Sequence, residues 1–174
     1  LNRLPNASLP PFSRDPYPIS DIRIAGVIDP LDGRAFAGSR LVLASRGMLF
    51  EWSISSDAVA LRMTRESDGA EIDSITEPVD LGETTFEIDC WHVDQKMWLF
   101  INGDLILELP FNNWSPEQRF QASYPDSSVD TYLTNPTLPR PSGPRIDWFF
   151  EGGVEAIRNV RVDRDLFYRP TMLD

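Results

Sequence analysis

The sequence predicts an all-β domain built as a two-sheet antiparallel sandwich, and three observations lead to this fold class. Short runs of alternating apolar residues recur through the chain and end at turn signals such as Arg46-Gly47. Helical periodicity with capping residues is nearly absent, and the one helix start, at residues 115–118, is long enough for about one turn. The pair Asn102-Gly103 lies between two alternating runs and predicts a tight hairpin.

The chain divides into three predicted parts. Residues 1–20 contain five prolines and form an extended lead-in, because proline fixes φ and cannot donate a hydrogen bond to a strand ladder. Residues 21–168 form a single domain of the predicted sandwich fold, since a chain of 174 residues suits a single core. Residues 169–174 are a short tail. A second proline-rich stretch, residues 135–144, is predicted to be a long surface connection.

Composition excludes some partners. The chain has 16 basic and 27 acidic residues and a net charge of −11, which argues against binding to nucleic acid or to anionic lipid. No apolar run approaches the roughly 18 residues of a membrane span, so no membrane insertion by this segment is predicted. The single cysteine, Cys90, cannot form an internal disulfide and is predicted to be a small buried hydrophobe.

The hairpin at Asn102-Gly103 predicts which side chains face the core. It pairs Ile101 with Asp104, and continued alternation places five apolar side chains on one face. For the preceding turn, a three-residue loop at residues 94–96 is favoured. A two-residue loop would bring Glu87 and Asp89 onto the core face, where unpaired carboxylates are costly. The side chains assigned to the core by this register are Trp98, Phe100, Leu105, Leu107 and Leu109, with Phe86, Ile88 and Cys90 from the strand before.

The opposite face of this hairpin collects more apolar side chains than a solvated face normally has. Either another layer of the fold covers it, or it is a ligand-binding or docking surface. The residues predicted for such a surface, including one tryptophan from the following loop, are Glu87, Asp89, Trp91, Leu99, Ile106 and Trp114.

Catalysis and metal binding are not predicted. A retaining glycosidase needs two carboxyl groups about 5 Å apart; Glu71 and Asp73 are predicted to share a strand face, but Glu77 is one residue too distant to complete the motif of such enzymes. His92, the only histidine, is predicted to be structural and to lie on the core face beside Trp98. Residues 29–33 are predicted to form a turn rather than a Ca²⁺ site, and no cofactor is expected.

Two stretches resemble known domains. Residues 93–104, Val-Asp-Gln-Lys-Met-Trp-Leu-Phe-Ile-Asn-Gly-Asp, have the strand, polar turn, aromatic strand and Asn-Gly turn that are typical of laminin-G and concanavalin A-like domains. Residues 152–162 are similar to the last strand of those domains. The resemblance implies an antiparallel jelly-roll sandwich over residues 20–165.

A narrower resemblance lies in residues 162–168, Val-Asp-Arg-Asp-Leu-Phe-Tyr. They are similar to the segment before the catalytic boxes of certain bacterial type I signal peptidases, some of which carry a lectin-like insertion. This implies a non-catalytic accessory module, on the extracytoplasmic side, whose partner is the parent protease domain or another protein. The Ser and Lys boxes of these serine endopeptidases are absent from this chain, whose only lysine is Lys96. Two alternatives stay open: a stand-alone carbohydrate-binding domain, and a glycan-active hydrolase of the concanavalin A-like group.

Overall fold

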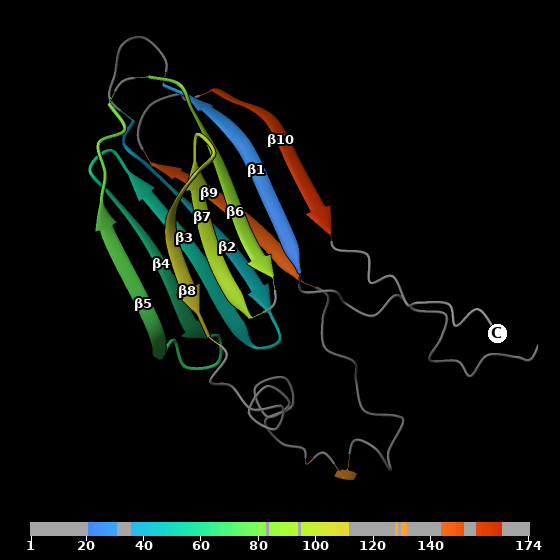
Figure 1. Ribbon diagram of the computed structural model, residues 1–174. Helices are drawn as coiled ribbons and strands as arrows, with labels where there is room; N and C mark the ends of the chain where they lie inside the picture. The colour runs from blue at the N-terminus through green and yellow to red at the C-terminus, as the bar shows by residue number, and fades with distance from the viewer. Residues whose placement is uncertain are drawn as a thin grey trace, which may run out of the picture.

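A computed structural model describes residues 21–30, 36–82, 84–93, 95–111, 128, 130–131, 144–151 and 156–164. In this part of the chain, ten strands form two five-stranded sheets that stack face to face (Figure 1). Every strand pair is antiparallel. The predicted fold class, an all-β antiparallel sandwich, is confirmed.

Sheet A is the layer nearer the viewer in Figure 1. Its strands, in spatial order, are β10 (Ala156–Arg164), β1 (Ile22–Asp29), β6 (Phe86–Val93), β7 (Lys96–Ile101) and β8 (Asp104–Pro110). Sheet B contains β5 (Glu71–Pro78), β4 (Ala58–Arg65), β3 (Met48–Ser55), β2 (Gly38–Ser45) and β9 (Arg145–Glu151). The chain changes sheet between β1 and β2, β5 and β6, β8 and β9, and β9 and β10, so each sheet combines segments that are distant in sequence.

The core lies between the two sheets. Trp52 of β3 is buried there, and its indole Nε1 donates a hydrogen bond to the backbone oxygen of Trp98 in sheet A at 2.9 Å. His92 is also buried and lies beside the ring of Phe50, with 4.2 Å between the ring centroids, and stacks on Phe111 at 5.4 Å. Cys90 is buried among these apolar side chains, as predicted.

The hairpin between β7 and β8 has the predicted turn but not the predicted register beyond it. Ile101 pairs with Asp104 across Asn102-Gly103, as the sequence indicated. The pairing then shifts, because Leu99 faces Leu107 and Ile106 is the extra residue of a β-bulge. Leu107 and Leu109 face the core as predicted, but the assignment of three other side chains to the core was wrong: Trp98, Phe100 and Leu105 point outward.

The turn between β6 and β7 also differs from the prediction. Val93 pairs with Lys96, which leaves two residues between the strands instead of three. One of them, Gln95, has a φ of 62°, the left-handed conformation that such short turns require. Glu87 and Asp89 still face outward, because the core face of β7 consists of Met97, Leu99 and Ile101 and not of its aromatic residues.

Several predictions lie outside the described residues. These are the lead-in at residues 1–20, the tail at 169–174, the helix start at 115–118 and most of the connection at 135–144. Within the part of the chain that the structure covers, no helix is long and apolar enough to cross a membrane.

Candidate functional site

The outer face of sheet A holds part of the surface predicted from the sequence. Glu87, Asp89 and Trp91 of β6 point outward, as predicted. Leu99 does not belong to this surface, since its side chain is 0% exposed in the core. The alternation of β7 is one residue out of step with the prediction, which explains this error. Ile106 is the half-buried bulge residue and packs against the core, and Trp114 lies outside the described residues.

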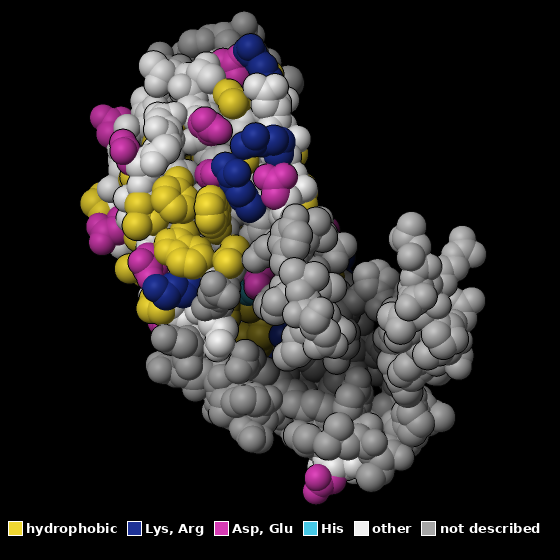
Figure 2. Space-filling model, turned by 45° about the vertical axis from the view of Figure 1, so that its right-hand side comes forward, with side chains coloured by type: hydrophobic (Ala, Val, Ile, Leu, Met, Phe, Trp, Pro, Cys, Tyr) yellow, Lys and Arg dark blue, Asp and Glu magenta, His cyan; other side chains and the backbone are white. Residues whose placement is uncertain are grey.

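Two aromatic residues that the sequence had placed in the core complete this surface. Trp98 and Phe100 of β7 stand beside Trp91 on the outer face, and all three are half-buried. The ring centroids of Trp91 and Trp98 are 6.3 Å apart, and the rings are nearly perpendicular at 80°. Those of Trp91 and Phe100 are 5.6 Å apart. We call these three residues the aromatic face; Figure 2 shows hydrophobic side chains gathered into a patch here, with charged side chains beside them.

Trp91 is held by a carboxylate that is itself held by a cation. Its indole Nε1 donates a hydrogen bond to Oδ1 of Asp89 at 2.7 Å. Arg23 of β1 donates to the same carboxylate through Nε, at 2.9 Å, and through Nη2. The Arg23 guanidinium carbon lies 5.2 Å from the centroid of the Trp91 ring. The hydrogen bond to Asp89 raises the pKa of Arg23 above its usual value, so the cation is permanent.

Trp98 lies beside a second paired carboxylate, on the neighbouring strands. Glu108 of β8, which pairs with Trp98 across the hairpin, accepts a hydrogen bond from Nζ of Lys96 at 2.6 Å. The Lys96 ammonium lies 5.6 Å from the centroid of the Trp98 ring. The hydrogen bond from Lys96 holds the pKa of Glu108 below its ordinary value. The aromatic face therefore contains two sets of cation, carboxylate and indole, the Trp91 set, in which the indole is bonded to its carboxylate, and the Trp98 set.

These two sets determine what the surface can bind. An indole has one N–H donor, and in the Trp91 set that donor is already satisfied by Asp89. The Trp91 ring is thus fixed at its polar edge, while the apolar faces of both rings can pack against a ligand. The charges of Arg23 and Lys96 balance those of Asp89 and Glu108, so these four side chains carry no net charge but supply donors and acceptors. Two further acids lie at this surface: Glu87, which points outward, and Asp163, 3.7 Å from Nη1 of Arg23.

The candidate catalytic carboxylates do not converge. Glu71 pairs with Thr64 and Asp73 pairs with Met63, because a bulge shifts the register between these two positions. Asp73 therefore lies on the side of β5 that corresponds to buried Met63, and Glu71 lies on the outer side with Thr64. The prediction that the two acids share a strand face was wrong, and they do not form the pair that a retaining glycosidase needs.

Other candidate ligands are engaged elsewhere. His92 lies in the core as predicted, although it pairs with Met97 rather than lying beside Trp98. Asp29 accepts a hydrogen bond from Thr85 at 2.7 Å and forms an ion pair with Arg158. Among the described residues, no three His, Cys, Asp or Glu side chains are grouped so that they could hold a metal ion.

No protein-family model and no curated protein matches this chain. Among solved structures, it is similar to sheep galectin-11 in complex with glycerol, with 11% identity, a TM-score of 0.48, and coverage of 82% of this chain and 89% of that one. It is also similar to the carbohydrate-binding module CBM66 from Bacillus subtilis, with 11% identity, a TM-score of 0.47, and coverage of 83% and 75%. A third is the CBM40 module of the Ruminococcus gnavus IT-sialidase bound to α2,3-sialyllactose, with 19% identity, a TM-score of 0.39, and coverage of 53% and 54%.

The class of this domain, a two-sheet antiparallel β-sandwich, follows from its own strands and their pairing. The resemblance of residues 162–168 to the segment in signal peptidases is tested by none of these structures, and it stays a prediction.

Proposed function

We propose that this domain is a non-catalytic carbohydrate-binding module and that it binds a neutral glycan on the aromatic face of sheet A. One observation carries the proposal: Trp91 and Trp98 stand on adjacent strands, and each indole lies beside a carboxylate that has its own cation. The CBM66 neighbour is named as a carbohydrate-binding module, but the proposal rests on the residues of this chain.

The chemistry of the site suits a sugar. A pyranose ring has an apolar C–H face surrounded by hydroxyl groups, so it needs both an aromatic surface and nearby donors and acceptors. Lys96 and Glu108 are each 38% exposed and can bond hydroxyl groups beside the Trp98 ring. Because a hydrogen bond already fixes the Trp91 indole, less side-chain entropy is lost on binding than for a free ring. The balanced charges favour a neutral ligand over an ionic one.

A glycan array probed with the wild-type domain and with the Trp98→Ala variant tests this proposal. We expect the wild type to bind neutral glycans and Trp98→Ala to bind them at least about tenfold more weakly, because truncating an aromatic anchor typically costs more than about 1.4 kcal/mol. Phe150→Ala is the matched control, since it removes another exposed ring that lies on β9. That control should bind as the wild type does.

Two results would contradict the proposal. The first is a wild-type domain that binds no glycan on the array. The second is a Trp98→Ala variant that is folded and binds glycans with wild-type affinity. If the aromatic face instead docks a protein, the array stays empty, which is the first of these results.

The setting of the domain is a separate proposal. The resemblance in residues 162–168 supports an accessory module of a signal peptidase-related protein, exposed on the extracytoplasmic side. The sequence of the full-length gene tests this. Flanking Ser and Lys boxes and a transmembrane helix are expected, and their absence would contradict it.

A further inference from the structure

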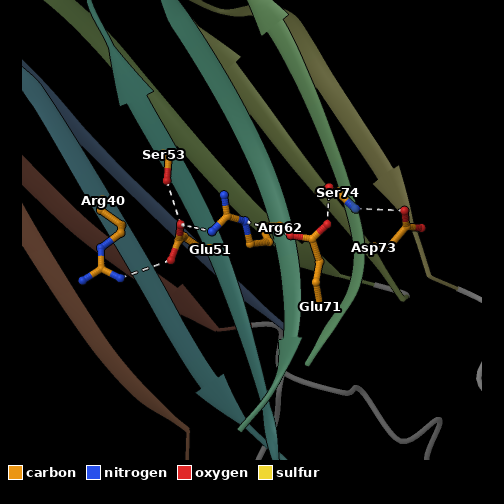
Figure 3. Close-up of polar contacts among 7 residues, drawn as sticks. All are labelled: Arg40, Glu51, Ser53, Arg62, Glu71, Asp73 and Ser74. Atoms are coloured by element: carbon orange, nitrogen blue, oxygen red, sulfur yellow. Dashed lines mark hydrogen bonds and ion pairs between the residues drawn. The ribbon is translucent and has the colours of Figure 1, made fainter. Parts of the chain in front are cut away.

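A second polar surface lies on the other side of the molecule, across the outer face of sheet B. Figure 3 shows charged and hydroxyl side chains from β2, β3, β4 and β5 that form one connected network. Adjacent strands are about 4.8 Å apart, so the row from β2 to β5 is about 14 Å long. We call this network the polar row; its members are Arg40, Glu51, Ser53, Arg62, Glu71 and Ser74.

Glu51 of β3 is at the centre of the polar row. Its carboxylate contacts Nη1 of Arg40 at 3.2 Å and Nη1 of Arg62 at 3.9 Å, from the strands on either side. The hydroxyl of Ser53 donates a hydrogen bond to it at 2.9 Å. The side chain of Glu51 is only 17% exposed, so three neighbours fix an acceptor that solvent and ligands can still reach from one direction.

The two ends of the polar row differ. At the β5 end, Glu71 contacts Nε of Arg62 at 3.4 Å and accepts a hydrogen bond from the Ser74 hydroxyl at 2.8 Å. At the other end, the Arg40 guanidinium carbon lies 4.6 Å from the centroid of the Phe149 ring, on β9. The Phe149 ring is 46% exposed, so the row ends in an open apolar surface.

Stability alone does not account for this arrangement. Ion pairs between half-exposed side chains contribute little to folding, and those of Arg62 are long. A guanidinium has more N–H donors than Arg40 and Arg62 use here, and the carboxylates keep unused lone pairs. Along the row, positively charged donors therefore alternate with negatively charged acceptors, and an exposed aromatic ring lies at one end.

We propose that the polar row is a second binding site for a neutral glycan, so that this single domain can bridge two glycans from opposite faces. Vicinal hydroxyl groups can donate to Glu51 or Glu71 while they accept from the arginine beside it, and Phe149 can pack against a ring face. An anionic ligand would be repelled by the carboxylate next to each arginine. The site is independent of the aromatic face, but bridging rests on the function proposed above.

The test uses isothermal titration with four neutral probes: cellotetraose, maltotetraose, mannotetraose and galactotetraose. For at least one probe, the wild type is expected to bind two equivalents. Trp98→Ala should keep the equivalent on sheet B, and the double variant Glu51→Gln/Arg62→Met should keep the one on sheet A. Arg65→Met is the matched control, because Arg65 is also on β4 but pairs with Asp68 in the adjoining turn. It should retain both equivalents.

Beads coated with the probe that binds provide the second readout. The wild-type protein should cross-link them. Trp98→Ala and Glu51→Gln/Arg62→Met each keep one site, so each should bind the beads without cross-linking them. Both variants should have a melting temperature comparable to that of the wild type. A single equivalent that Trp98→Ala removes and Glu51→Gln/Arg62→Met leaves intact overturns this inference but not the proposed function. A single equivalent with the opposite pattern overturns bridging and the aromatic face together. No binding of any probe by the wild type overturns both proposals.

Discussion

The bulge at Ile106 makes a sharp prediction about two leucines on one hairpin. Leu99 is 0% exposed in the core, whereas Leu105 is 50% exposed on the outer face. A Leu→Ala change at a fully buried site lowers the free energy of unfolding by about 2 to 5 kcal/mol, since a cavity adds to the lost transfer energy. At Leu105 the removed carbons are half in water already and leave no enclosed cavity, so the loss should be about 1 kcal/mol or less.

Urea unfolding of Leu99→Ala and Leu105→Ala, followed by tryptophan fluorescence and far-ultraviolet circular dichroism, measures this difference. The two substitutions remove the same atoms, so each serves as the control for the other. We expect similar m-values and a much lower midpoint for Leu99→Ala. If Leu105→Ala were the more damaging variant, the uninterrupted register would hold and the aromatic face would not exist as described.

Three further outcomes are expected. Cys90 should resist iodoacetamide in the native state and react in urea, because burial raises the pKa of its thiol well above the usual value; rapid native labelling would contradict its placement. Gly26→Ala should lower the free energy of unfolding by about 1 to 3 kcal/mol, because the added Cβ would lie 3.0 Å from the ring of Trp148; an unchanged melting temperature would refute that close packing. The pKa of Glu108 is lowered in the folded state, so its contribution to stability is present above its unfolded pKa of about 4.3 and is lost as pH falls through the folded value. Glu108→Gln should therefore lose less stability than the wild type between about pH 5 and pH 3. Urea unfolding at several pH values measures this, and an equal loss of unfolding free energy in both proteins would contradict it.

The sequence predicted the fold class because local signals agree with one another. Alternation in Phe86, Ile88 and Cys90 places all three in the core, and Asn102-Gly103 forms the turn that its left-handed preference indicates. Such features depend only on residues near one another in the chain.

The aromatic face could be predicted only in part, for a physical reason. In β7 both alternating sets are apolar, so either Met97 with Leu99 or Trp98 with Phe100 could face the core. The two-residue turn after β6 resolves this choice, because it pairs buried Cys90 with Leu99, and the bulge at Ile106 then keeps Leu107 on the core face. The partner of Asp89, Arg23, comes from a strand 66 residues earlier, a pairing that strand order alone determines. The polar row on sheet B depends on four strands in register and had no local signal.

The central claim is that a glycan packs against Trp91 and Trp98, and indole signals in ¹H–¹⁵N spectra test it most directly. The chain contains five tryptophans, so each indole Nε1–H can be assigned by substitution and followed during titration with the best-binding glycan of the array. We expect the signals of Trp91 and Trp98 to shift to saturation, while that of Trp148, whose indole Nε1 is buried, stays in place. A glycan that saturates the domain and leaves the signals of both Trp91 and Trp98 unchanged would contradict the account.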